Sequence, residues 1–429
     1  MNRVVKTKQE GFHHIGLLLV VAVLVIIGLV GWRVFSHQKS GSGAPSEILN
    51  SADSAEEKAV AAGKYLSRNK CEGTKKLTLT HLPMKEEDFT ILIPYGLTVG
   101  GHVTPIDHQY FSPADYKSPR DAYPVYAMAD AVVTEIQPRT TGRGTEYRMV
   151  FTHSCTSLYY YDLVTSLTGK VKEAYDKNPN DINLPIKAGE QIGKIGGQTL
   201  DFAVWDTSKA LTGFVNPASY DGEAWKIYTA DPYPFYTPAL RQLLIERNPR
   251  TAEPIAGKID YDVDGKLIGN WFEKGTGGYR DFKNAAMEYW GGHLSIAPDM
   301  YDPSVIVISI GNYDSYPKYG PNLDTTTTDG SDARQYYARA GGPDPATIDQ
   351  TSGLVRYELV QRKYITPIGE TWNNMSLIKG PKAVNTSSAV IGTVLLQMTG
   401  PRTLKVEVFP GKTAGLVDAF GAQAKTYER

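Results

Sequence analysis

The chain has 429 residues with 45 basic and 46 acidic side chains, so its formal net charge is −1. This length predicts two domains rather than one core, and the balanced charge argues against a general nucleic-acid-binding protein. Its 27 Tyr, 41 Gly and 26 Pro residues are typical of β-structure with many turns. We therefore expect a mainly β protein that does not bind nucleic acid.

The first apolar segment predicts a membrane anchor. Ile15 to Trp32 is a run of 18 residues without a charge, which as a helix would span roughly 27 Å, close to the thickness of a hydrocarbon core. We expect a transmembrane helix over residues 15–35 and a cytoplasmic N-terminus over residues 1–14, because basic residues precede the run. A cleaved signal peptide is the alternative, but no A-x-A-like site follows the run.

Residues 36–66 are expected to form a linker that ends in a short helix. Ser36 to Pro45 has the composition of a flexible tether. Ser54 to Glu57 fits a capping box in front of an Ala-rich stretch that reaches Leu66.

The sequence contains two cysteines, Cys71 and Cys155. Outside the cytoplasm we expect a disulfide between them, and such a loop would add roughly 4 kcal/mol in the chain-entropy model. Two separate buried thiols are the alternative. Two cysteines alone do not make a zinc site.

The segment from Ile186 to Asp206 predicts two strands separated by glycine turns. Ile186 to Gly193 has the pattern of a short strand that enters a tight turn, where glycine tolerates a positive φ. Leu200 to Asp206 alternates, so its apolar residues would face a core and Asp201 would point to the other side of the sheet.

These residues resemble a known family. Lys187 to Gly197 followed by Thr199 to Val204 is similar to the VKxGqxIgxxG and HLHFEv motifs of the lysostaphin-like (LytM-type) zinc endopeptidases, which cut peptidoglycan cross-links. Pro124 to Val133, PVYAMADAVV, is similar to the family's PVyAaadGvV. The resemblance extends from His102 to Trp205 and implies a small β-sheet domain, the duplicated hybrid motif. We expect this domain over residues 67–250, including a Pro- and aromatic-rich bridge at its end.

The resemblance implies a zinc site whose residues are changed in this chain. The family binds zinc through the His and Asp of HxxxD and the second His of HxH. Here His102 and Asp107 match the first pair, although they are five residues apart instead of four, and Asp201 replaces the third ligand. Thr199 and Asp162 stand where the family has two catalytic histidines. We therefore expect a degenerate relative with no catalytic residue.

Three interpretations of this site stay open. His102, Asp107 and Asp201 could hold zinc or, with Asp162, a harder divalent cation. A pocket with Asp162, Thr199 and His108 could instead hydrogen-bond a carbohydrate or a peptide. A vestigial pocket with satisfied polar side chains, and no cofactor, is the third.

Residues 251–429 are expected to form a second β-rich domain, either a closed barrel or a sandwich. The clearest strands are Val305 to Ile310, Leu354 to Val360, Val394 to Met398 and Leu404 to Phe409, and a hairpin loop joins the last two.

Asp260 to Gly265, DYDVDG, resembles the opening of a calcium-binding loop, but Trp271 stands where that loop needs a bidentate Glu. A β-hairpin is favoured instead, with strands over Lys258 to Val263 and Lys266 to Phe272.

Together these features predict a single-pass protein of the cell membrane whose C-terminal domains lie outside. The expected function is non-catalytic binding or scaffolding at the cell envelope, with a cell-wall polymer or an envelope protein as partner. The alternatives are a divalent-metal hydrolase of peptidoglycan or another polymer, and a carbohydrate-binding surface protein that works through its C-terminal domain.

Overall fold

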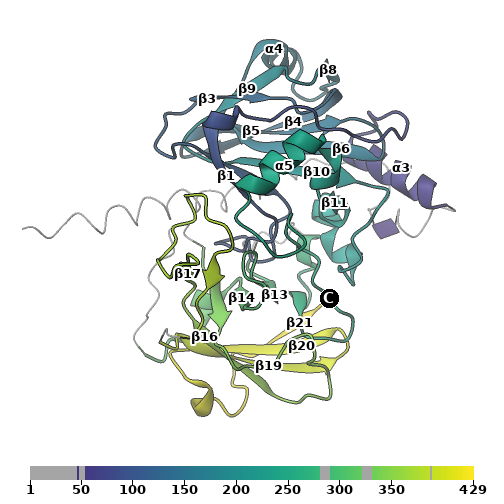
Figure 1. The fold of residues 1–429 in the computed structure, drawn as a ribbon. Coiled ribbons are helices and arrows are strands. Elements are labelled where there is room, and N and C mark those ends of the chain that lie inside the picture. The colour runs from purple at the N-terminus through teal and green to yellow at the C-terminus, as the bar shows by residue number, and fades with distance from the viewer. Residues whose placement is uncertain (1–45, 48–53, 281–289, 321–330, 387–388) are drawn as a thin grey trace, which may run out of the picture.

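The computed structural model describes residues 46–47, 54–280, 290–320, 331–386 and 389–429. These residues form a mainly β fold in which a large sheet lies beside a closed barrel (Figure 1). The prediction of a mainly β protein is confirmed.

The expected transmembrane helix, residues 15–35, lies outside the described residues. Within the ranges given above, the structure has no helix with both the length and the apolar character needed to cross a membrane. The membrane anchor therefore stays a prediction.

The described chain enters the fold through helix α3 (Ala55–Leu66), which begins with the predicted capping box. The Ser54 side chain accepts a hydrogen bond from the backbone of Glu57, and the Glu57 side chain accepts one from the backbone of Ser54. Just after α3, Cys71 and Cys155 form a disulfide with an S–S distance of 2.06 Å. This bond joins the segment that follows α3 to the turn at Cys155, which connects two central strands of the large sheet described next.

In the described part of the chain the large sheet has eight strands, and all of its pairings are antiparallel. Their order across the sheet is β1 (Phe89–Ile93), β2 (Gln109–Pro113), β10 (Leu200–Asp206), β6 (Ser157–Val164), β5 (Gly144–Thr152), β4 (Ala131–Thr141) and β8 (Leu184–Ile186), with β11 (Thr229–Ala230) paired to β10.

A second, three-stranded sheet contains β3 (Tyr123–Tyr126), β9 (Gln191–Ile195) and β7 (Ser166–Leu167). The turn between β8 and β9 places Gly189 at φ +79°, where a residue with a side chain would be strained. Helix α4 (Gly169–Lys177) leads from β7 towards β8, in a stretch for which the sequence predicted no element.

The C-terminal strands close into an eight-stranded antiparallel barrel within the described residues. Its strands are β12 (Gly269–Glu273), β13 (His293–Pro298), β14 (Ile306–Ile310), β15 (Arg334–Ala338), β16 (Val355–Val360), β19 (Gly392–Gly400), β20 (Thr403–Pro410) and β21 (Lys425–Glu428), and β21 pairs back with β12. The four predicted strands of this region are confirmed, and the barrel rather than the sandwich is correct. A cluster of buried apolar side chains, among them Trp271, Leu294 and Val406, packs within it.

Short elements connect and flank the two β-structures. They are η2 (Glu86–Asp88), η3 (Pro217–Tyr228), η4 (Tyr233–Phe235), α5 (Pro238–Arg247), η5 (Gly278–Arg280), η6 (Tyr313–Ser315), η7 (Ala414–Leu416) and the strand pair β17 (Tyr364–Ile365) and β18 (Lys382–Ala383). Helix α5 lies at the end of the Pro- and aromatic-rich bridge.

The predicted hairpin before the barrel is wrong in its first half. A turn is present at Asp264 and Gly265, but residues 258–263 form no strand because their side chains cap other segments. The carboxylate of Asp260 accepts a hydrogen bond from the Gly213 backbone, and that of Asp262 accepts one from the backbone of Asn270. Through these side-chain contacts the segment is held against both the bridge and β12, without a strand pairing.

The large sheet and the barrel share apolar contacts. One cluster joins Ile91 and Ile93 of β1 to Val307 of β14 and Tyr337 of β15. The core of the sheet also includes Phe272 of β12. The two β-structures are therefore packed together, and the predicted boundary at residue 250 stays a prediction.

Candidate functional site

The candidate site residues Asp201 and Asp162 lie on one face of the large sheet because the strand register places them opposite each other. Asp201 on β10 is opposite Asp162 on β6 and Tyr110 on β2. Opposite residues in an antiparallel pair share a face, and so do residues two positions apart on one strand. Asp201 thus points away from the face of Phe202, as its alternation in the sequence predicts.

His108 lies at the centre of this site, between two carboxylates. Its Nδ1 is 3.5 Å from an oxygen of Asp107, and its Nε2 is 3.3 Å from an oxygen of Asp201 and 3.0 Å from the Tyr110 hydroxyl. Burial alone would lower the pKa of His108, but the charge of Asp201 and the contact with Asp107 raise this pKa to about 9. At neutral pH the ring is an imidazolium that neutralises its neighbours.

Asp107 has two further partners, both from η3. The Lys226 ammonium donates to one oxygen at 2.8 Å, and the Trp225 indole N–H donates to the other at 2.7 Å. Lys226 also pairs with Glu223 at 3.0 Å and is only 5% exposed. Burial opposes the charge of Asp107, yet Lys226 and His108 hold the pKa of that carboxyl well below its usual range.

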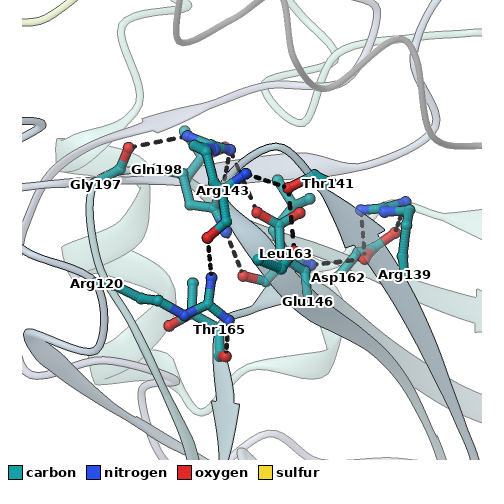
Figure 2. A network of polar contacts seen from close by, with 12 residues as sticks. Arg120, Arg139, Thr141, Arg143, Glu146, Asp162, Leu163, Thr165, Gly197 and Gln198 are labelled. Carbon is teal, nitrogen blue, oxygen red and sulfur yellow. Dashed lines mark hydrogen bonds and ion pairs between the residues drawn. The ribbon is translucent and has the colours of Figure 1, made fainter.

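Asp162 is paired with Arg139 of β4. The guanidinium donates to both carboxylate oxygens, at 2.9 and 3.1 Å. Figure 2 shows this pair at the edge of a larger network, in which Arg143 lies 3.5 Å from Glu146 and also contacts Gln198. A bidentate arginine–carboxylate pair of this kind is among the strongest polar contacts in proteins.

His102 and Thr199 complete the set of residues singled out in the sequence. The Thr199 hydroxyl donates to Asp201 at 3.4 Å. The ring of His102 lies 6.2 Å from that of His108, and its enclosed Nε2 has no hydrogen-bond partner. Burial, followed by the positive charges of His108 and Lys226, lowers the pKa of His102 to about 3, so this ring is neutral.

The donor set does not fit a metal ion. A zinc or calcium site needs carboxylates and imidazoles that are free to coordinate. Here each carboxylate already forms an ion pair within the chain: Asp107 with Lys226, Asp201 with the cationic His108, and Asp162 with Arg139. Among the residues that the structure describes, no group of three or more His, Cys, Asp or Glu side chains is placed to hold a metal.

The structure brings together all the site residues predicted from the sequence, and it adds partners that the sequence analysis missed. Lys226 and Trp225 lie in the bridge, 119 and 118 residues from Asp107. The one signal for them is a lysine flanked by Trp225 and Ile227, since a charge within an apolar stretch predicts a buried ion pair.

Comparisons with known proteins give limited similarity. No protein-family model matches the chain, and no curated protein matches it. Among solved structures, the chain is similar to Csd3 from Helicobacter pylori, at 15% identity over 32% of this chain and 33% of that chain, with a TM-score of 0.21. It is also similar to a zinc-containing peptidase from Vibrio cholerae, at 15% identity over 32% of this chain and 38% of that chain, with a TM-score of 0.21. The chain thus spans about a third of the length of each.

Proposed function

We propose that this chain is a catalytically degenerate, LytM-like protein that binds or scaffolds at the cell envelope. One observation supports the proposal above all. Each of the three carboxylates at the candidate site is paired with a cation of the chain itself: Asp107 with Lys226, Asp201 with His108 and Asp162 with Arg139. In this proposal the sheet keeps the duplicated hybrid motif implied by its sequence and has lost the chemistry.

The protonation states at the site also argue against hydrolysis. A general acid or base works best when its pKa is near the working pH. The pKa of His108 is about 9 and that of His102 is about 3, so neither ring changes its charge readily near neutral pH. Asp201 and Thr199 are also almost fully buried, at 2% and 1% exposure, which leaves a substrate no access to them in this conformation.

The location and partner belong to the same proposal. We infer a single-pass anchor at residues 15–35 with the sheet and the barrel outside the membrane, where the disulfide between Cys71 and Cys155 would persist. The partner is then a cell-wall polymer or an envelope protein.

The test is sedimentation of the full chain, in detergent, with purified peptidoglycan sacculi. We expect co-sedimentation without release of cross-link fragments, and no change when a chelator is added. Soluble glycans serve as the competing ligand, because their preferential binding would favour a carbohydrate-binding surface protein. Chelator-sensitive release of fragments that is lost in His102→Ala would establish a metal hydrolase instead.

A further inference from the structure

A second polar group lies on the same face of the large sheet, beside the site described above. Arg148 of β5 is stacked among three aromatic rings: its guanidinium carbon is 4.0 Å from the ring centre of Trp225, 4.8 Å from that of Tyr160 and 5.7 Å from that of Trp205. Contacts of this kind cover the flat faces of a guanidinium and leave its N–H donors, which lie in the plane, at the edges.

Three other arginines on and around the sheet have polar partners, whereas Arg148 is not paired. Arg139 binds Asp162, Arg143 contacts Glu146, and Arg120 donates to backbone carbonyls (Figure 2). Within the described residues Arg148 forms no ion pair, and its enclosed Nε lacks a hydrogen-bond partner. Unpartnered polar atoms are rare inside proteins, so this one calls for an explanation such as a ligand or ordered water.

Arg148 lines a small pocket between β4, β5, α3 and η3. The pocket is partly open and has a volume of about 30 Å³, and its lining includes Gln137, Trp205, Trp225 and Tyr65. That volume holds about two water-sized groups, which is enough for a carboxylate.

The other polar atoms of the lining define the ligand further. Gln137 donates through its amide N–H to Glu135, which Arg68 neutralises, and this leaves the enclosed Oε1 of Gln137 without a partner. The pocket thus combines a free guanidinium with a free acceptor. A carboxylate with an N–H or O–H donor beside it, as at the free end of a peptide or in a hydroxy acid, complements both.

We propose that this pocket binds the carboxylate of such a ligand in a bidentate contact with Arg148, with the adjacent N–H or O–H donating to Gln137. The proposal does not depend on the proposed function, because it uses none of the paired carboxylates of the first site. Arg148 would act by recognition alone, with no bond made or broken.

The experiment is a titration of the full chain, followed by tryptophan fluorescence because Trp205 and Trp225 flank the guanidinium. The probes are N-acetylglycine, its uncharged amide N-acetylglycinamide, glycolate and acetate. We expect binding of N-acetylglycine and glycolate, weaker binding of acetate, and none of the amide. Stronger binding of N-acetylglycine than of glycolate would identify a peptide end as the source of the carboxylate. Stronger binding of glycolate would identify a hydroxy acid.

Variants then assign the contact. Arg148→Met should weaken the binding of N-acetylglycine at least about tenfold, and Arg148→Lys less, since lysine keeps the charge without the planar fork. Arg402→Met, which removes an exposed arginine of the barrel hairpin, is the matched control and should bind as wild type. Gln137→Leu should abolish the preference for N-acetylglycine over acetate.

Equal binding of the acid and the amide would overturn the proposal, and so would unchanged affinity in a folded Arg148→Met variant. Failure of every probe to bind would also overturn it, since ordered water would then account for the pocket.

Discussion

The site face of the large sheet and the interior of the barrel are both buried, but different chemistry fills them. The barrel interior is packed with apolar side chains such as Trp271, Leu294 and Val406. The sheet face instead buries paired charges, among them Asp107 with Lys226 and Asp201 with His108. Apolar residues of similar volume are often at least as stabilising as a buried ion pair, so stability alone does not explain the polar face. Its charges are the part of the molecule that a function must account for.

The largest effect is expected where the sheet face loses one member of a pair. Lys226→Met should lower the free energy of unfolding by roughly 3–5 kcal/mol, because it leaves Asp107 buried beside one cation instead of two. Urea denaturation measures this loss. The double variant Lys226→Met/Asp107→Asn should recover part of it, and Lys172→Met, which removes an exposed helical pair, should change little. Without recovery in the double variant, the loss would come from packing or from Glu223, the other partner of Lys226, and not from its pair with Asp107.

The barrel should respond to truncation without any such rescue. Leu294→Ala removes a fully buried side chain and should cost about 2–5 kcal/mol through lost burial and a cavity. Urea denaturation again provides the measurement. Leu416→Ala, at a position that is 68% exposed, is the control and should be close to neutral. If Leu294→Ala lowered the free energy of unfolding by less than Leu416→Ala does, the barrel interior would be loosely packed.

The pH dependence of stability separates the two regions further, because His108 belongs to the sheet alone. Its folded pKa of about 9 lies above the usual value of about 6.5. The stability that it contributes is therefore complete below about pH 6.5 and is lost as the pH rises through 9. We expect a fall of about 1–3 kcal/mol in the free energy of unfolding across this range.

His108→Gln should flatten that fall and leave the rest of the pH profile intact. The other strongly shifted groups titrate outside this range: the pKa values of His102 and His293 are about 3 and that of Asp262 is about 6, whereas burial raises the pKa of Tyr116 and Tyr228 to about 12. Denaturation series at several pH values between 6.5 and 9 provide the comparison. An equal slope in the variant would mean that His108 is not the imidazolium described above.

The two regions also differ in how far the sequence predicts them. In the barrel, alternating apolar residues were enough to place its four clearest strands, because each strand is defined by neighbours in sequence. In the sheet, the same alternation placed Asp201 off the apolar face, and the resemblance placed Asp162 at the position of a family histidine; the register that sets the two opposite each other came from the structure. The partners could not be found in this way, because Lys226 meets Asp107 across 119 residues and lies on the irregular element η3. A polar site is completed by contacts between residues far apart in the sequence, which a local sequence pattern does not predict.

The smallest expected effect tests whether burial, rather than pairing, distinguishes the sheet face. Arg402 and Asp264 at the barrel form a bidentate pair at 2.8 and 2.8 Å, much like Arg139 and Asp162 at 2.9 and 3.1 Å. The side chains of the first pair are 47% and 57% exposed, whereas those of the second are 12% and 13% exposed. Water and salt screen the exposed pair, so Arg402→Met should lower the free energy of unfolding by only about 0–1 kcal/mol. Arg139→Met should lower it several times more, because the loss of Arg139 leaves the buried Asp162 without its cation. Denaturation at low and high salt measures both, and the small cost of Arg402→Met should vanish at high salt while that of Arg139→Met persists. Equal costs for the two variants would mean that the geometry of the pair sets its energy and that the polar face has no special status.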